Sequence, residues 1–198
     1  MMITRRRAVL ACLGMGSFAG IRTWAASPRE FWNDKDSAEW SEEEIHRLLT
    51  KSPWAKEVRA KSNRSAVGLT GGRSDMGELP QFTGLVRWET ALPVREARRR
   101  KVISEVADYY AISVTGLPMM GASNKESIQL QRKGKHPIYP ARVATPESEG
   151  SMIFYFPRRD QPIKSENKEV VFWTVLRLLQ LEVKFDLEEM IYHGQLEL

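Results

Sequence analysis

The stretch Trp40–Trp54, WSEEEIHRLLTKSPW, carries the clearest structural signals in the chain and predicts a helix over about residues 41–51. Ser41 followed three residues later by Glu44 is a capping box, in which each side chain accepts a hydrogen bond from the other residue's backbone amide. Pro53 ends the helix, because the residue before a proline is disfavoured in the helical conformation. The helix has one apolar face, so we expect it to pack on the rest of the protein.

The residues around this helix form one unit with it, over residues 27–60. Phe31 and Trp32 precede the helix and are expected to pack on the body of the protein, and a first strand follows over residues 54–60. Residues 61–81 are rich in serine, asparagine and glycine and lack periodicity, which predicts a flexible loop.

From residue 82 to residue 198 the sequence predicts a β-rich body that belongs to the same domain. Apolar and polar residues alternate over most of it, as in half-buried strands. Strands are predicted over residues 84–91, 109–115, 128–133, 138–143, 152–156, 168–176 and 178–185. A helix over residues 175–182 remains an alternative, because no glycine or asparagine marks a turn there.

One segment of the body breaks the alternation. Leu92-Pro93 begins a second helix with proline in its first turn, and apolar residues follow at helical spacing as far as Tyr110. Its polar face is rich in arginine and is expected to be solvated. The predicted fold is therefore mainly β with two helices (α+β): an antiparallel β-sandwich-like sheet, an N-terminal capped helix and one inserted basic-faced helix.

Residues 1–26 have the pattern of a signal peptide. Arg5 and Arg6 form a twin-arginine-like start, an apolar run follows, and Ala25 or Ala26 is the expected cleavage position. This predicts export to the periplasm or cell envelope, by the twin-arginine or the general route. If the segment is not cleaved, it would hold the protein at the membrane.

The only cysteine, Cys12, lies in this leader. It follows a short lipoprotein-like sequence, but too few apolar residues precede it for a typical lipoprotein signal. After cleavage the chain would have no thiol, and therefore no disulfide, no thiolate nucleophile and no cysteine metal ligand.

The net charge of +5 belongs mostly to the leader. Four arginines and no acidic residue lie in residues 1–26, which leaves 26 lysines and arginines against 25 acidic residues in the remainder. A net charge of +1 does not favour a nucleic-acid partner, which needs a basic face. Weak contact with a membrane surface through Arg98, Arg99 and Arg100 is the alternative role for the basic helix.

Catalytic motifs are not evident in the sequence. His46, His136 and His193 lack metal-ligand spacing, and neither a Gly-x-Ser-x-Gly elbow nor a complete phosphate-binding loop is present. Ser165 and Lys168 match Ser-x-x-Lys without its companion motifs. The sequence therefore predicts no metal or cofactor, and it assigns no catalytic residue.

Aromatic residues are the remaining candidates for binding. Five tryptophans follow the leader, and an exposed row of aromatic rings on a sheet could stack on sugar rings or on a peptide. We take Trp88 and Trp173 as candidate binding residues. Arg158 and Arg159, at the end of a predicted strand, could bind an acidic ligand.

Several segments resemble those of a group of uncharacterised exported bacterial proteins. The similar segments are Phe31-Trp32, Glu39–Ser41, Ser52–Lys56, Val86–Glu89, Ser113–Pro118 and Met190–Leu198. The resemblance implies a single exported domain in which residues 61–81 vary, and it carries over no catalytic residue.

The sequence leaves two functional hypotheses. The first is a non-catalytic binding or interaction module in the periplasm or cell envelope, with an unidentified protein or glycan ligand. The second is an exported hydrolase that uses a pair of carboxylates, which would require a cleft with two carboxyl groups at catalytic separation.

Overall fold

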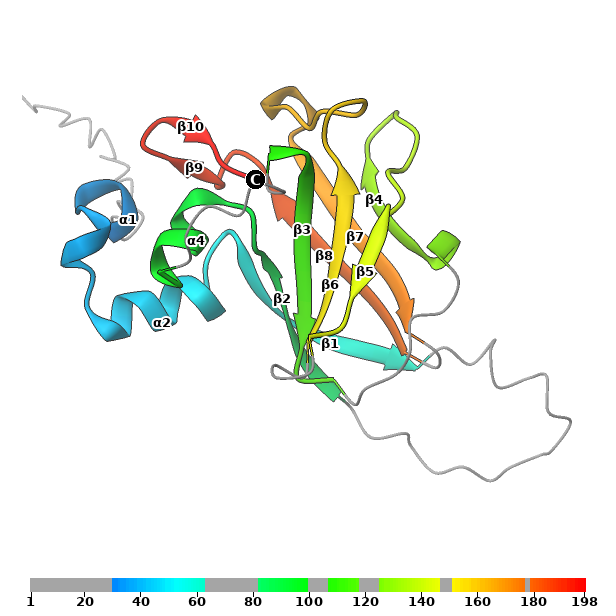
Figure 1. The fold of residues 1–198 in the computed structure, drawn as a ribbon, viewed down its shortest axis with the longest axis horizontal. Coiled ribbons are helices and arrows are strands. Elements are labelled where there is room, and N and C mark those ends of the chain that lie inside the picture. The colour runs from blue at the N-terminus through cyan, green and yellow to red at the C-terminus, as the bar shows by residue number, and fades with distance from the viewer. Residues whose placement is uncertain (1–29, 63–81, 100–106, 118–124, 147–150, 177–178) are drawn as a thin grey trace, which may run out of the picture.

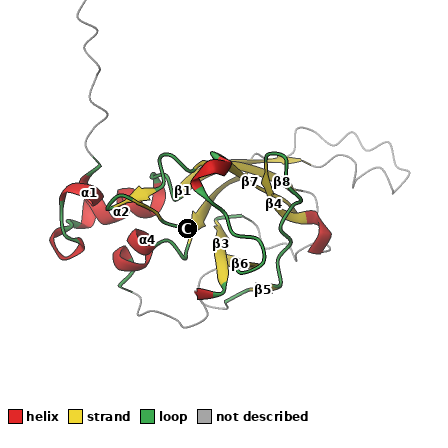
Figure 2. Ribbon diagram, turned by 90° about the horizontal axis from the view of Figure 1, so that it is seen from above, coloured by secondary structure: helices red, strands yellow, loops and turns green. Residues whose placement is uncertain are grey.

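An antiparallel sheet of eight strands, curled so that its strands lie in two layers, forms the centre of the protein (Figures 1 and 2). The structure, a computed structural model, describes residues 30–62, 82–99, 107–117, 125–146, 151–176 and 179–198. The fold is mainly β with short helices, which confirms the predicted α+β class and the antiparallel sheet.

The strand order across the sheet is β4-β7-β8-β1-β2-β3-β6-β5. The strands are β1 Ala55–Ser62, β2 Phe82–Trp88, β3 Tyr109–Thr115, β4 Ile128–Arg132, β5 Arg142–Ala144, β6 Ser151–Pro157, β7 Glu169–Leu176 and β8 Leu179–Asp186. A separate hairpin pairs β9 Ile191–Tyr192 with β10 Gln195–Leu196. The helices are α1 Phe31–Asp34, α2 Glu42–Thr50 and α4 Leu92–Ala97, with short 3-10 turns η1 Ser37–Glu39, η3 Lys125–Ser127 and η4 Ser165–Asn167.

Strand β1 connects the two layers of the sheet. Residues 55–60 pair with β2, whereas residues 61–62 pair with β8. On the other side of the sheet, Ile138 pairs with Leu130 of β4, and β5 just beyond it pairs with β6. The segment that contains both Ile138 and β5 therefore runs from β4 to β6, while β4 and β5 remain the outermost strands of the sheet.

The interior between the layers is filled by the inward residues of the alternating strands. Trp88 of β2 is fully buried and makes edge-to-face contacts with Phe185 of β8 and Tyr110 of β3, at ring-centroid distances of 5.3 and 5.9 Å. Other fully buried large side chains include Phe154, Phe156, Phe172, Leu130, Ile112, Ile128, Ile138 and Leu181. Aromatic packing across the two layers holds the curled sheet together.

Helix α2 has the cap that the sequence predicts. The Ser41 hydroxyl accepts a hydrogen bond from the Glu44 amide at 3.2 Å, and the Glu44 carboxylate accepts one from the Ser41 amide at 2.9 Å. Leu48 is fully buried, and Ile45 and Leu49 pack against the core. The apolar face of α2 therefore lies on the body of the protein.

The segment before α2 packs against the C-terminal hairpin. Trp32 contacts Trp54, and Trp40 contacts Tyr192, at ring-centroid distances of 5.5 and 6.3 Å. Asn33 accepts a hydrogen bond from the His193 amide at 2.8 Å. The expectation that Phe31 and Trp32 pack on the body is confirmed, since both are buried, and Trp40 extends this aromatic packing to Tyr192 of β9.

Two predicted helices differ from the structure. Helix α4 begins at Leu92 with Pro93 in its first turn, as predicted, but Tyr110 lies in β3, so the helical assignment of Tyr110 is wrong. The alternative helix over residues 175–182 is also wrong, because β7 and β8 pair through Val175 and Gln180.

Three sequence predictions fall on residues outside the described part. They concern the leader over residues 1–26, most of the 61–81 loop, and residues 100–106 after α4. Among the residues that the structure describes, no helix is long and apolar enough to cross a membrane.

Substitution of Ser41 by alanine should lower the free energy of unfolding by about 1 kcal/mol, because the Glu44 amide loses its capping acceptor. Urea unfolding followed by circular dichroism measures this difference. Ser41→Asp restores a capping oxygen and should stay close to the wild type. Equal stability of Ser41→Ala and the wild type would show that the cap contributes nothing.

Candidate functional site

The four predicted binding residues lie in four different environments. Trp88 is fully buried in the core, so the prediction that its side chain binds a ligand is corrected. The Arg158 guanidinium lies 4.5 Å from the centre of the Tyr110 ring and donates to the Leu198 carbonyl oxygen, which gives it a structural role. Arg159 is exposed and pairs with Asp108 at 2.7 Å.

Trp173 is the predicted binding residue that keeps part of its indole at the surface. It is half-buried on the outer side of β7, where residues alternate between the core and the surface. Its neighbours across the strands are Gln129 of β4 and Glu182 of β8. The structure does not bring Trp173 together with Arg158 and Arg159, which follow the end of β6.

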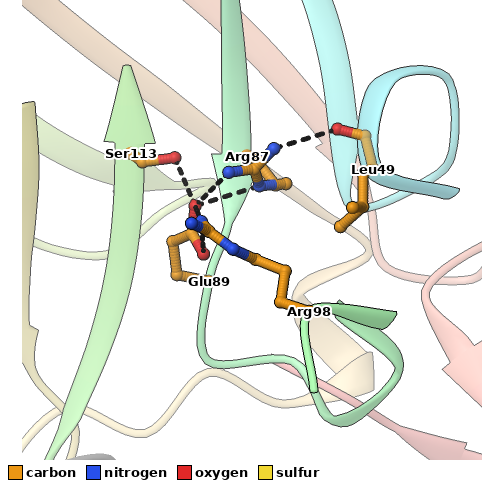
Figure 3. A network of polar contacts seen from close by, with 5 residues as sticks. All are labelled: Leu49, Arg87, Glu89, Arg98 and Ser113. Carbon is orange, nitrogen blue, oxygen red and sulfur yellow. Dashed lines mark hydrogen bonds and ion pairs between the residues drawn. The ribbon is translucent and has the colours of Figure 1, made fainter. Parts of the chain in front are cut away.

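A buried ion cluster lies where α2 and α4 meet the sheet (Figure 3). The Glu89 carboxylate accepts hydrogen bonds from Arg87 and Arg98, each at 2.8 Å at its shortest, and from the Ser113 hydroxyl at 2.6 Å. Arg87 also donates to the Leu49 carbonyl oxygen at 3.2 Å. One carboxylate thus links two strands to α4 and, through Arg87, to α2.

Local structure explains how these side chains meet. Arg87 and Ser113 are paired in the register of β2 and β3, so they lie on the same outer face. Glu89 follows directly after β2, and α4 then returns the chain so that Arg98 faces the same carboxylate (Figure 3). The prediction that the arginine-rich face is solvated is therefore wrong for Arg98, whose side chain is 17% exposed and pairs with Glu89. Arg99 is exposed.

The pKa of Glu89 lies below its ordinary value of 4.5. Burial alone would raise this pKa, but the positive charges of Arg87 and Arg98 and the hydrogen bond from Ser113 outweigh burial. Glu89 is therefore ionised at neutral pH, and both of its oxygens are engaged. This arrangement suits a structural ion pair and not a general acid, which needs a raised pKa.

Four carbonyl groups in the last turn of α2, those of residues 46 to 49, accept hydrogen bonds from nearby side chains or from the Lys51 amide. Thr50 Oγ1, the Lys51 amide and Ser52 Oγ donate to the carbonyl oxygens of residues 46, 47 and 48, at 2.7, 2.7 and 2.6 Å. Arg87 donates to the fourth, that of Leu49. These hydrogen bonds stabilise the helix end, and Arg87 joins it to β2.

An open groove of about 340 Å³ lies beside this helix end. Its wall and floor come from the end of α2 and from β1, β2 and the end of β3, with the lining residues Thr50, Lys51, Glu57, Thr83, Gly84, Leu85, Thr115 and Gly116. Glu57 is the only carboxylate among these lining residues. The groove therefore does not hold the two carboxyl groups that a paired-carboxylate hydrolase needs.

Gly84 forms part of the groove floor because of a close backbone approach. A Cβ atom at this position would lie 2.9 Å from Leu117 Cγ and 3.0 Å from the Thr115 carbonyl oxygen. Only glycine fits there without a shift of the Leu117 side chain and the Thr115 carbonyl group.

The three histidines do not come together. His46 lies on α2, His136 in the turn after β4, and His193 in the turn of the β9–β10 hairpin, and all three are exposed. Across the described residues, no group of three or more histidine, cysteine, aspartate or glutamate side chains could hold a metal ion.

Comparisons with known proteins identify no relative. No family model, no curated protein and no solved structure gives a significant match to the chain. The functional conclusion therefore depends on the geometry of the described residues.

Substitution of Glu89 by glutamine should lower the free energy of unfolding at pH 7 by about 3 kcal/mol, because it leaves two guanidinium groups without their carboxylate. The folded-state pKa of Glu89 is lowered. The stability that ionised Glu89 contributes is therefore fully present above pH 4.5, and it is lost as the pH falls through the folded-state pKa. The stability difference between wild type and variant should therefore shrink on acidification below pH 4.5.

Glu57→Gln is the matched control, since Glu57 is an exposed carboxylate on the neighbouring strand β1. In urea unfolding from pH 7 to pH 3.5, the free energy of unfolding of this variant should stay close to that of the wild type at each pH. A Glu89→Gln protein as stable as the wild type at pH 7 would show that the cluster does not hold the helices on the sheet.

Proposed function

We propose that this protein is an exported, non-catalytic binding module of the periplasm or cell envelope, and that its ligand docks on the outer face of β4, β7 and β8 around Trp173. The observation that carries the proposal is the partial exposure of the Trp173 indole on a sheet face. Trp32, Trp40, Trp54 and Trp88 are buried. Trp173 is therefore the tryptophan in the described residues that a ligand can reach.

The surroundings of Trp173 support binding. Val171 and Val175 lie before and after it on the same face of β7, and both are half-buried. Long polar side chains flank this apolar stripe on both sides, from Gln129 of β4 and Glu182 of β8. An apolar centre with a polar rim is the usual composition of a recognition surface.

The alternative, an exported hydrolase with a carboxylate pair, has less support. Glu89 is the buried carboxylate of the described residues, and two arginines hold it in the ionised form. The groove beside α2 has Glu57 alone. Neither place offers one protonated and one ionised carboxyl group, which this chemistry requires.

The export part of the proposal predicts a shortened product. When the full chain is expressed in a bacterial host, the mature protein should begin after Ala25 or Ala26 and appear in the periplasmic fraction. Intact-mass measurement of the fractionated protein checks this. Replacement of both Arg5 and Arg6 by lysine should block export if the protein uses the twin-arginine route, and should leave export by the general route unchanged. A cytoplasmic product that keeps residues 1–26 would contradict export.

The binding part of the proposal predicts that Trp173 is required for capture of an envelope component. Wild-type protein and Trp173→Ala are immobilised and exposed to solubilised cell envelope, and retained protein and sugar are both quantified. We expect retention by the wild type and at least about tenfold less by Trp173→Ala, since aromatic anchors dominate binding surfaces. Glu57→Gln, on another face, should behave as the wild type. Equal retention by all three proteins would contradict a role for this face.

A further inference from the structure

A second aromatic residue lies in line with Trp173. Ile138 pairs antiparallel with Leu130 of β4, so Tyr139 is at the position beside Gln129. Ile138 is fully buried, and the next side chain along an extended strand points the opposite way. Tyr139 is accordingly 46% exposed and is the exposed large hydrophobic side chain among the described residues. Tyr139, on the segment bridged to β4, thus lies in one row with Gln129 of β4 and Trp173 of β7.

The width of this row suits an extended ligand. Tyr139 and Trp173 are separated by two strand spacings, or roughly 10 Å. This separation is wider than one sugar ring, so a single ring cannot stack on both aromatic side chains. A chain of linked rings can place one ring on each of them.

The polar groups between the two aromatic residues are already oriented. Gln129 Nε2 donates to the Glu126 carbonyl oxygen at 3.0 Å, and Gln131 Nε2 donates to Gln129 Oε1 at 3.1 Å. Within the described residues, Gln131 Oε1 and the Trp173 indole nitrogen make no hydrogen bond. The face therefore offers Gln131 Oε1 as an acceptor and the Trp173 indole N–H as a donor. Because the Gln129 and Gln131 amides are already held by hydrogen bonds, less side-chain entropy is lost on binding.

The charges on this face favour a neutral ligand. Lys184 of β8 lies 3.9 Å from Glu169, so these two charges largely cancel, and the Glu182 carboxylate beside Trp173 disfavours an anionic ligand. No cluster of basic side chains surrounds Trp173 in the described residues, which disfavours phosphate groups and anionic lipid. Strand β7 is paired on both sides, so an added peptide strand has no free backbone groups to pair with there.

We propose that the row Tyr139–Gln129–Trp173, with Gln131, binds a neutral oligosaccharide, with one sugar ring stacked on each aromatic side chain and ring hydroxyl groups hydrogen-bonded to the amides. Aromatic faces complement the apolar faces of sugar rings, and neutral amides complement hydroxyl groups without a charge requirement. The inference rests on the proposed function, because it names the ligand class of the same face.

The test is calorimetric titration of the full chain with short oligosaccharides of glucose, of N-acetylglucosamine and of galacturonic acid. We expect one of the two neutral sugars to bind and the anionic sugar to bind at least tenfold more weakly. Trp173→Ala and Tyr139→Ala should each weaken binding by about tenfold or more, whereas Trp173→Phe and Tyr139→Phe, which keep a ring, should lose less. Arg159→Ala, at an exposed position away from the row, is the control. Circular dichroism confirms that each variant is folded.

Indole proton resonances give an independent readout for the same protein. Trp173→Phe assigns the Trp173 signal, which should shift on addition of the bound sugar, while the signals of the buried tryptophans should not. Three results would overturn the inference: binding that Trp173→Ala and Tyr139→Ala leave unchanged, equal binding of the anionic sugar, or absence of binding to either neutral sugar. If no sugar binds but Trp173→Ala still abolishes capture of an envelope protein, the proposed function stands and the ligand class is wrong.

Discussion

The placement of both longer helices depends on one buried carboxylate, that of Glu89. Removal of a charge from water costs several kcal/mol unless partners surround it, so this position is tolerable only when Arg87, Arg98 and Ser113 all reach it. Each partner comes from a different part of the fold, and Arg87 also holds the last turn of α2. The position of α2 and α4 over the sheet is therefore coupled to the pairing of β2 with β3.

The C-terminal segment also holds α4 in place. The Tyr192 hydroxyl donates to Glu96 of α4 at 2.6 Å, and burial, together with this hydrogen bond and the charge of Glu96, raises the pKa of Tyr192. Glu197 accepts hydrogen bonds from the Leu92 amide at the start of α4 and, through its carbonyl oxygen, from the Trp54 indole. Segments distant in sequence thus close around the helices, and their aromatic residues are used for packing.

The sequence predicts the strands well because alternation is a local property of the chain. Phe154 and Phe156, or Leu181 and Val183, reveal their buried face without knowledge of their partners. The partners of charged and aromatic side chains are not local. The burial of Trp88 against Phe185 and the row that joins Tyr139 to Trp173 depend on segments far apart in sequence. The ion pair of Arg98 with Glu89 spans nine residues, but it depends on how α4 returns the chain to the sheet.

The same reasoning explains why the surface of β7 is more informative about function than the tryptophans of the core. Trp88 fills space between two layers, and its size is explained by packing alone. The outer face of a sheet needs no residue of that size, since valine or threonine satisfies the same strand geometry, as Val171 and Val175 do on either side of Trp173. Partial exposure of a large apolar ring costs solubility and brings no packing that the core requires. We therefore propose a ligand, and not folding, as the reason for a ring in that position, aligned with exposed Tyr139 and beside amides held by their own hydrogen bonds.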